Sequence, residues 1–371
     1  MASKVRTLLY LLLACAVVLL LDLVYLASNS SGRQRNGYSV RRGSKDHGSR
    51  WASDNNGALP AGTIAVPINR TEYLNPNKNC SIGKSRQRMV NTYGAKFNAS
   101  LPAFIDARFI HIPHILKYPP PFGFDNSVPS VFKLLQHLPA TGLPADLQRK
   151  SCLRCVVVGN GGILRRSALG GVIDNFDVVI RMNDAPTRGF ERDVGDKTTI
   201  RIFYPESAPK KDKDYVGKDW LFLMMAFKVQ DLTWLETMAK GQTLASTKEF
   251  WKRPAIKVPK PAKDFRLLNP AIVSETAFDV IGLNRNDGKM KANVPTTGSI
   301  AIMVGLRLCD EVAIVGFGYN FNDPNSPMHY YDSIRMNDMK KSWTHDISQE
   351  KAMLLQLVQQ GIITDLTGGI R

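Results

Sequence analysis

The sequence predicts an α/β domain in which helices flank a mainly parallel central sheet, preceded by one transmembrane helix and a stem. Three observations support this prediction. Strand-like and helix-like segments alternate from Cys155 onward, several strand candidates are apolar throughout, and one long apolar run lies near the N-terminus. Hydrophobic residues make up 44% of the 371 residues, which excludes a wholly disordered chain, and the net charge of +17 predicts an anionic partner.

The apolar run from Leu8 to Ala27 has about the length that spans a bilayer. Its only charged residue is Asp22, near the C-terminal end, and Tyr10 and Tyr25 lie near its two ends, as interfacial aromatic residues do. A cleaved signal peptide is the alternative, but its apolar region is usually only about 7–15 residues long. We therefore expect a cytosolic tail at 1–7 and a retained transmembrane signal-anchor at 8–27.

The segment at 28–78 is rich in Ser, Gly, Asn and Arg and shows little apolar periodicity, which predicts a flexible stem. The acceptor sequence of N-glycosylation, Asn-X-Ser/Thr, occurs only before residue 101, at Asn29, Asn69, Asn79 and Asn98. We expect glycosylation at Asn69, Asn79 and Asn98. The folded domain at 79–371 is then expected to lie outside the cytosol.

Seven segments of the folded domain have the pattern of strands: Cys155–Val158, Asp177–Arg181, Thr198–Tyr204, Trp220–Met225, Phe265–Leu268, Glu311–Val315 and Ile362–Leu366. Helical patterns lie between them, at Leu232–Lys240, Ile272–Ile281, Ser299–Leu308 and Ile347–Gln359. This alternation is typical of a parallel sheet, in which ligands bind beyond the carboxyl ends of the strands. We therefore expect the chemistry near Gly159, Asn183, Glu206 and Gly316.

Two polar turns follow strand candidates. The turn Gly159–Gly162 can bring backbone N–H groups close to a phosphate or a ribose, although Leu164 breaks the G-x-G-x-x-G dinucleotide fingerprint. Asn183 lies where the next strand would stop, and Pro186 prevents its continuation. The simpler alternative at each position is a tight turn.

A third polar segment, Pro295–Ser299, opens an apolar helix. Hydroxyl groups and a glycine at a helix N-terminus form a ready anion site. A plain N-cap is the simpler interpretation of this segment taken alone.

Two of the six histidines lie in polar turns near the C-terminus. His329 begins the sequence His-Tyr-Tyr-Asp, and His345 precedes Asp346, which with Gln349 resembles a capping box. Histidine can act as a general base near neutral pH, although a lone histidine is more often structural. Glu350 lies about 140° around a helix from His345, so the spacing does not imply a direct pair.

Four of the five cysteines lie outside the apolar run: Cys80, Cys152, Cys155 and Cys309. A redox Cys-X-X-Cys follows a strand and opens a helix, whereas the pair at 152 and 155 precedes a strand. The four could bind zinc, but the second Cys-X-X-Cys of a zinc ribbon is missing. Two disulfides in an oxidising compartment are the favoured interpretation.

An Asp-Lys-Asp triplet at 212–214 resembles the D-x-D motif of metal-dependent glycosyltransferases. It lies in the charged segment Lys210–Lys218, where a solvated loop is the simpler interpretation. We therefore expect no metal site at this triplet. The chain as a whole is expected to need no cofactor.

Four segments, taken in order, resemble the sialylmotifs of animal sialyltransferases. They are Cys155–Glu206, Pro295–Gly318, His329–Asp332, and His345 with Glu350. The match covers most of the chain between residues 150 and 350, and it is most similar to β-galactoside α-2,3-sialyltransferases of the N-acetyllactosaminide type.

The resemblance implies a GT-A-like fold and an inverting, metal-independent transfer of sialic acid. The donor would be CMP-sialic acid, and the acceptor the 3-hydroxyl of terminal galactose in Galβ1-3/4GlcNAc glycans of glycoproteins or glycolipids. It also implies a type II protein of the Golgi membrane, anchored by one N-terminal helix, with a lumenal catalytic domain and no nucleic-acid partner. Lactosylceramide and Galβ1-3GalNAc are the alternative acceptors. The alternative functions are a non-catalytic, membrane-anchored nucleotide- or glycan-binding protein and a nicotinamide oxidoreductase.

By motif position, the resemblance implies that Asn160 and Asn183 contact the donor nucleotide. The same pocket would be lined by Thr297, Gly298, Ser299 and Gly318. The sequence departs from the family at Ile163, where many members have a polar residue, and at Val294, where some have a tyrosine. These departures concern details of donor contact rather than the reaction.

The resemblance further implies that His329 binds the donor phosphate and that His345 is the general base for the acceptor hydroxyl. Supporting roles fall to Gly159, Tyr330 and Glu350. The disulfides that it implies are Cys155–Cys309 and Cys80–Cys152.

Overall fold

The computed structural model describes residues 80–106, 113–139, 141–210, 219–286, 290–318, 323–339 and 344–370. The predictions for the tail at 1–7, the anchor at 8–27 and the stem at 28–78 concern residues outside these ranges, as do those for Asn69, Asn79 and the triplet at 212–214. Among the residues described, no helix is both long and apolar enough to cross a membrane.

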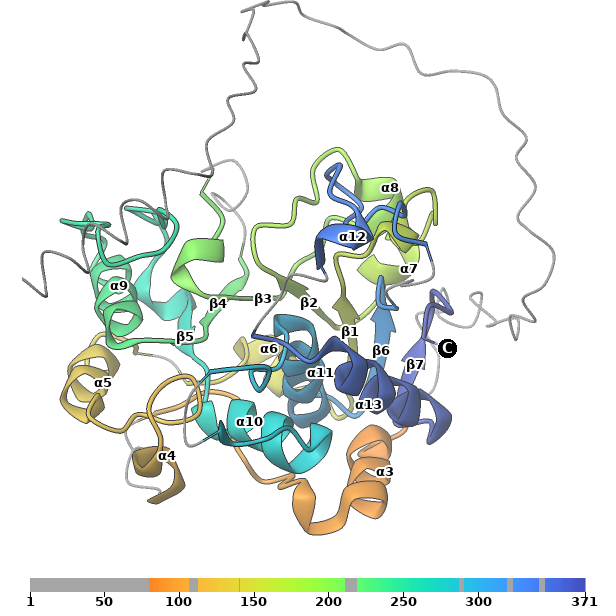
Figure 1. The fold of residues 1–371 in the computed structure, drawn as a ribbon, viewed down its shortest axis with the longest axis horizontal. Helices are drawn as coiled ribbons and strands as arrows, with labels where there is room; N and C mark the ends of the chain where they lie inside the picture. Colours follow the sequence, from red (N-terminus) through yellow and green to blue (C-terminus); the bar gives the residue numbers. More distant parts are fainter. Residues whose placement is uncertain are drawn as a thin grey trace, which may run out of the picture. The chain divides into compact units, whose positions relative to one another are not determined.

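A seven-stranded sheet with the order β5-β4-β3-β2-β1-β6-β7 forms the centre of the domain (Figure 1). Every neighbouring pair is parallel, so the predicted parallel sheet is confirmed. The strands lie within two residues of the predicted ends: β1 Arg154–Val158, β2 Val178–Met182, β3 Ile200–Phe203, β4 Leu221–Met224, β5 Phe265–Leu267, β6 Glu311–Val315 and β7 Ile363–Asp365.

The strands form where short apolar runs can be buried on both faces of the sheet. In β1 all five residues are buried, and its valines are β-branched residues that favour extended backbone. Cys155 and Val157 belong to the core on one face, whereas Val156 and Val158 belong to the core on the other. This alternation has the period of two expected of a strand.

The order of the strands creates one switch point. The chain runs outward from β1 through β2, β3 and β4 to β5 and then returns, so that β6 pairs with β1 on its other side. In open parallel sheets, ligands bind in the crevice beyond the carboxyl ends of the strands at such a point. The site is therefore expected beyond Val158 and Val315.

The four predicted helices are confirmed; α13 has the predicted ends, and the other three begin two or three residues earlier than predicted. They are α9 Val229–Ala239, α10 Pro270–Ser274 continued by the π-helix η6 Glu275–Ile281, α11 Thr297–Leu308, and α13 Ile347–Gln359. Several shorter helices were not predicted: α3 Lys84–Tyr93, α4 Pro113–Lys117, α5 Val128–Leu135, α6 Ala145–Gln148, α7 Gly170–Asp174, α8 Glu191–Val194 and α12 Met336–Met339. Single turns occur at η1 Gly94–Lys96, η2 Gly162–Leu164, η3 Pro205–Ser207 and η5 Ala262–Asp264.

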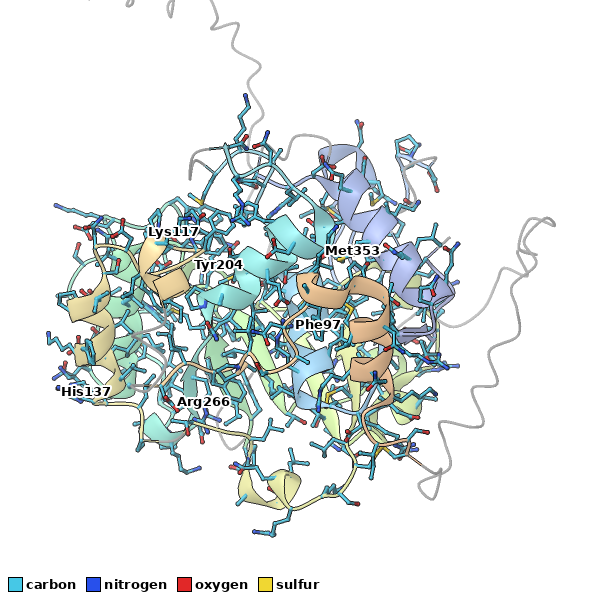
Figure 2. All side chains as sticks on the ribbon, turned by 90° about the horizontal axis from the view of Figure 1, so that it is seen from below. Phe97, Lys117, His137, Tyr204, Arg266 and Met353 are labelled. Atoms are coloured by element: carbon cyan, nitrogen blue, oxygen red, sulfur yellow. A yellow bond between two sulfur atoms is a disulfide. The ribbon has the colours of Figure 1, made fainter. Side chains whose placement is uncertain are left out.

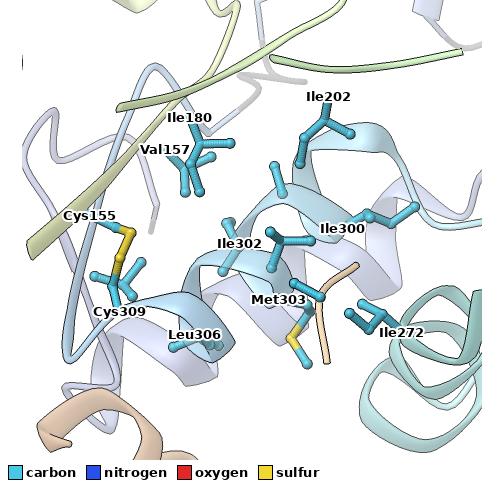
Figure 3. Packing of buried hydrophobic residues seen from close by; sticks show 14 of the residues in the cluster. Cys155, Val157, Ile180, Ile202, Ile272, Ile300, Ile302, Met303, Leu306 and Cys309 are labelled. Atoms are coloured by element: carbon cyan, nitrogen blue, oxygen red, sulfur yellow. A yellow bond between two sulfur atoms is a disulfide. The ribbon is translucent and has the colours of Figure 1, made fainter. Parts of the chain in front are cut away.

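One face of the sheet is covered by α11, which packs across β1, β2 and β6. A Cβ on Gly305 of α11 would lie 3.6 Å from the side chain of Val157 and 3.7 Å from that of Ile180, so this part of the helix faces the sheet (Figure 3). Helices α3, α10 and α13 extend this layer, which Figure 2 views from below. The opposite face is covered by α5 and α9 over β3–β5, and by α7 over β1, β2 and β6.

Both predicted disulfides are confirmed. Cys155 in β1 is bonded to Cys309, the residue that caps the C-terminus of α11 (Figure 3). Cys80 is bonded to Cys152, which lies just before β1. The four cysteines are therefore structural, and the zinc and redox alternatives do not apply to them.

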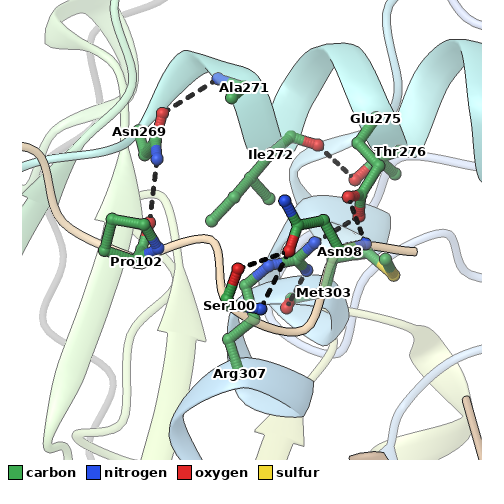
Figure 4. A network of polar contacts seen from close by, with 10 residues as sticks. All are labelled: Asn98, Ser100, Pro102, Asn269, Ala271, Ile272, Glu275, Thr276, Met303 and Arg307. Atoms are coloured by element: carbon green, nitrogen blue, oxygen red, sulfur yellow. Dashed lines mark hydrogen bonds and ion pairs between the residues drawn. The ribbon is translucent and has the colours of Figure 1, made fainter. Parts of the chain in front are cut away.

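A buried ion pair links α11 to η6. Arg307, in the last turn of α11, donates to the carboxylate of Glu275 and, at 2.9 Å, to the carbonyl of Met303 (Figure 4). The backbone N–H of Asn98 donates to the second oxygen of Glu275 at 2.8 Å. Burial raises the pKa of Glu275, although the charge of Arg307 opposes this effect.

Removal of the Arg307 guanidinium is expected to leave a buried carboxylate without its cation. We expect Arg307→Met to lower the free energy of unfolding by about 3–5 kcal/mol, measured by chemical denaturation. The matched control is the double variant Glu275→Gln/Arg307→Met, which removes both charges and should lose less stability. A double variant that is less stable than the single one would contradict this account.

Candidate active site

The glycine turns that follow β1 and β6 lie against each other at the switch point. The N–H of Gly159 donates to the carbonyl of Val315 at 2.7 Å, and that of Gly161 to Gly316 at 3.0 Å. A Cβ atom on Gly159 would lie 2.4 Å from the carbonyl oxygen of Gly316. These positions therefore have no room for a side chain, which lets the two turns pack directly against each other.

The turn after β6 also contacts α11 and the C-terminal segment. Gly318 has a φ of 93°, and a Cβ there would lie 2.0 Å from the carbonyl oxygen of Gly369. A Cβ on Gly298 would lie 3.0 Å from the ring of Phe317. The structure therefore places Gly298 beside the turn after β6, which carries Gly318.

Asn183 follows β2 in the left-handed region, with a φ of 54°. Arg201 in β3 donates to its carbonyl at 2.8 Å and to that of Ala185 at 2.9 Å, which holds the turn in place. The side-chain oxygen of Asn183 is buried and has no hydrogen-bond partner among the residues described. Because buried polar atoms are nearly always paired, this oxygen is a candidate ligand contact.

The start of α11 is held by a carboxylate from α13. Glu350 is buried and accepts from the N–H of Thr296 at 2.9 Å and from its hydroxyl at 2.6 Å, and it also accepts from the hydroxyl of Ser299. Thr296 is the N-cap of α11 and accepts from the N–H of Ser299 at 3.3 Å. The next two residues, Thr297 and Gly298, form the first turn of the helix.

The environment of Glu350 agrees with its spacing from His345, which does not imply a direct pair. Burial raises the pKa of Glu350, and the hydrogen bonds from Ser299 and Thr296 oppose this effect. No hydrogen bond joins Glu350 to His345 in the part of the chain that the structure describes. The N-cap interpretation of the segment Pro295–Ser299 is confirmed, with Thr296 as the cap.

His345 lies just before α13, beside the segment that leads into α11. Its Nδ1 lies 2.7 Å from the carbonyl oxygen of Val294, and the N–H of Val294 donates to Thr344 at 3.1 Å. Since a carbonyl only accepts, Nδ1 carries a proton, and in the neutral ring the lone pair is then on Nε2. The predicted N-cap is confirmed, because Asp346 accepts from the N–H of Gln349 at 3.0 Å.

His329 has a carboxylate as its partner. Its Nδ1 lies 2.8 Å from Oδ2 of Asp332, and its ring stacks on Tyr331 with 5.0 Å between centroids. Its backbone forms an antiparallel bridge with Gly161, and the N–H of Tyr330 donates to the carbonyl of Asn160 at 3.0 Å. The His329 segment is therefore attached directly to the turn after β1.

Tyr330 joins this segment to the turn after β2. Its hydroxyl donates to the carbonyl of Pro186 at 2.6 Å, and burial raises the pKa of Tyr330 to about 12. The hydroxyl therefore stays protonated and remains a donor at neutral pH. The contact connects the His329 segment to the turn that contains Asn183.

Two arginines are buried beneath these turns, Arg181 in β2 and Arg201 in β3. Burial lowers the pKa of Arg181 to about 10, so this residue remains charged at neutral pH. Its strongest hydrogen bonds go to the carbonyls of Val194 and Lys197 at 2.8 Å each, not to a carboxylate. Positive charge near the turns favours an anionic ligand.

Two other residues that the sequence singles out, Glu206 and Asn98, take part in contacts elsewhere. Glu206 follows β3 as expected, but it is buried and paired with Lys228 at 2.8 Å. Asn98 is exposed and lies in the network of Figure 4, where its side-chain oxygen accepts from the hydroxyl of Ser100 at 2.6 Å. Within the described ranges, the one group of potential metal ligands is Cys80, Cys152 and Asp310, whose two sulfur atoms form a disulfide.

The raised pKa of Glu350 predicts a pH dependence of stability. A carboxyl whose pKa is higher in the folded state stabilises that state most below its unfolded pKa, and the contribution is lost as the pH rises through the folded pKa. The free energy of unfolding of the wild type, relative to Glu350→Gln, should therefore fall as the pH rises from about 4 to about 8.

Urea denaturation at several pH values measures this difference. Glu249→Gln, at an exposed carboxylate, is the control and should show little dependence of the difference on pH. If the difference in the free energy of unfolding between wild type and Glu350→Gln is constant or grows with pH, this would contradict the raised pKa of Glu350.

Comparisons with known proteins agree with these features. The family model described as glycosyltransferase family 29 (sialyltransferase) matches residues 106–362. A CMP-N-acetylneuraminate-beta-1,4-galactoside alpha-2,3-sialyltransferase of Mus musculus is 42% identical over 304 residues, which cover 81% of this chain and 80% of the relative. A lactosylceramide alpha-2,3-sialyltransferase of Bos taurus is 41% identical over 298 residues, 79% of this chain and 71% of the relative.

Solved structures show the same likeness. The crystal structure of a mammalian sialyltransferase matches with a TM-score of 0.62 and 27% identity, covering 78% of this chain and 98% of the other. A structure of a mammalian sialyltransferase in complex with Gal-beta-1-3GalNAc-ortho-nitrophenol matches with a TM-score of 0.61 and 25% identity, covering 78% and 100%. The motifs, the parallel sheet with its glycine turns and these matches together show that the chain belongs to glycosyltransferase family 29, the sialyltransferases.

Proposed function

We propose that this enzyme transfers sialic acid, with inversion and without a metal ion, from CMP-sialic acid to the 3-hydroxyl of a terminal galactose in Galβ1-3/4GlcNAc glycans. The observation that supports it most is the contrast between two histidines. Nδ1 of His345 lies beside the neutral carbonyl of Val294, whereas Nδ1 of His329 lies beside the carboxylate of Asp332. Such different partners suit two different roles in one reaction.

His345 suits the role of general base. Its Nδ1–H is held by the carbonyl of Val294, so the ring presents the lone pair of Nε2. In the proposed reaction Nε2 takes the proton of the acceptor hydroxyl while the hydroxyl oxygen bonds to the anomeric carbon of sialic acid. The bond from that carbon to the phosphate oxygen breaks, and CMP leaves with the electron pair.

His329 suits the stabilisation of the leaving phosphate. The carboxylate of Asp332, 2.8 Å from Nδ1, orients the ring and stabilises an imidazolium. An imidazolium can donate from Nε2 to a phosphate oxygen as negative charge develops there.

The donor nucleotide is proposed to bind along the turns after β1 and β2. The unpartnered oxygen of Asn183 can accept from a hydroxyl or amino group of the nucleotide, and Asn160 lies in the turn that carries the His329 segment. The N–H groups of Thr297 and Gly298, in the first turn of the twelve-residue helix α11, can bind anionic oxygens. CMP-sialic acid carries both a phosphate and a carboxylate.

The cellular setting is likewise a proposal. The apolar run at 8–27 would anchor the chain as a type II protein of the Golgi membrane, with the catalytic domain in the lumen. Two disulfides are consistent with an oxidising compartment, and the exposed position of Asn98 suits a glycan acceptor. Lactosylceramide is a second candidate acceptor, because relatives with 41% identity carry that name.

Release of CMP by the full-length chain in detergent tests this proposal. We expect release from CMP-sialic acid in the presence of EDTA to require an acceptor and to be fastest with Galβ1-4GlcNAc or Galβ1-3GlcNAc. Lactosylceramide and Galβ1-3GalNAc are run in parallel, and the linkage of the product is determined by NMR. Faster release with lactosylceramide would replace the proposed acceptor, and no release from a chain that binds CMP would contradict the transferase function.

Substitution of the two histidines should separate binding from turnover. We expect His345→Ala to lower kcat by about 10²–10⁴ with CMP affinity nearly unchanged. His329→Ala should weaken the binding of CMP more than the binding of cytidine, which lacks the phosphate. His137→Ala, at a histidine just after α5 and outside the site, is the control. Lost CMP affinity with normal turnover in His345→Ala would contradict the base assignment.

A further inference from the structure

The side chain of Arg165 spans the turn that begins at His329. Its Nε donates to the carbonyl of Tyr330 at 3.1 Å, and its Nη2 donates to the carbonyl of His329 at 3.1 Å and to that of Asp332. One guanidinium therefore binds backbone oxygens at both ends of the turn. The planar fork of arginine, with its five donors, suits several acceptors at once, which a single lysine ammonium does not match.

The remaining hydrogen bonds attach mainly the first half of this turn. The N–H of Gly162 donates to Met328 at 3.3 Å, and that of Tyr330 donates to Asn160 at 3.0 Å. On the far side, the N–H of Ile334 donates to the carboxylate of Asp332 at 3.1 Å, and the carbonyl of Ile334 accepts from the N–H of Met328 at 2.8 Å, both of them contacts local to this segment. Arg165 therefore connects the backbone of Asp332 to the β1 side of the site.

This connection has a consequence for the His329 ring. The imidazole keeps its orientation only while the carboxylate of Asp332 stays 2.8 Å from Nδ1. If the carbonyl of Asp332 lost its anchor, the carboxylate could move away from the ring. A displacement of about 1 Å in such a supporting group can cost about 10²-fold in rate.

We propose that Arg165 is a positioning residue that keeps Asp332 on His329, and so keeps His329 directed at the donor phosphate. The inference rests on the proposed role of His329. Arg165 follows η2, the turn that continues directly from the glycines after β1. The proposal therefore implies that the nucleotide-binding turn and the phosphate-binding histidine are coupled through one exposed side chain.

The test uses the full-length chain and the variants Arg165→Met and Arg165→Lys. Calorimetry gives the affinities for CMP and for cytidine, and initial rates give kcat and KM for CMP-sialic acid. We expect Arg165→Met to weaken CMP binding and lower kcat/KM by about 10- to 100-fold, with cytidine affinity changed less than about threefold. Arg165→Lys should fall between Arg165→Met and the wild type.

The matched control is Arg166→Met, the same substitution at the neighbouring exposed arginine. Arg166 makes none of the contacts that join Arg165 to the turn. It should bind CMP as the wild type does. The thermal midpoint of each variant is also measured, and it should stay within a few degrees of wild type, since Arg165 lies at the surface.

A double-mutant cycle with His329→Ala distinguishes positioning from general support. If Arg165 acts through His329, Arg165→Met should change CMP affinity by less than about threefold once the imidazole is gone. The same loss in both backgrounds, or an equal loss for CMP and cytidine, would overturn the proposal. Unchanged CMP affinity in His329→Ala alone would instead overturn the role of His329 on which the inference rests.

Discussion

The contact between the glycine turns after β1 and β6 is the constraint on which the site depends. Because the chain returns to place β6 beside β1, the carboxyl ends of these strands meet at the only reversal of strand order in the described sheet. A Cβ on Gly159 would lie 2.4 Å from the carbonyl oxygen of Gly316, so larger residues would separate the turns. The His329 segment and the start of α11 are both built onto this contact.

Helix α11 is held at both ends, which fixes its N-terminal N–H groups relative to the sheet. Glu350 accepts hydrogen bonds from Thr296 and Ser299 at one end. At the other end, Cys309 is bonded to Cys155 in β1, and Arg307 is paired with Glu275. These contacts come from a neighbouring helix, a strand and a π-helix, so the position of an anion at the helix start depends on the packing of the whole domain.

The two histidines show how the same side chain acquires different chemistry from its neighbours. A backbone carbonyl holds the ring of His345 through Nδ1, and a carboxylate holds the ring of His329. The first arrangement suits a neutral base and the second a cation. Asp332 belongs to the same motif as His329, whereas only the fold brings Val294 to His345, 51 residues further along the chain.

The sequence by itself determined the seven strands, the four long helices, the family and, through the resemblance, both disulfides, because short apolar runs, helical periodicity and motifs are local patterns. Five of the helices that escaped prediction have only four or five residues, which carry little periodicity, whereas α3 and α5 have ten and eight residues. Only the tertiary structure decided the order of the strands and the partners of the site residues. Thr296 is hydrogen-bonded to Glu350, 54 residues further along the chain, and Arg165 is hydrogen-bonded to Tyr330, 165 residues further along. Such pairs follow from packing rather than spacing, so no local pattern in the chain could reveal them.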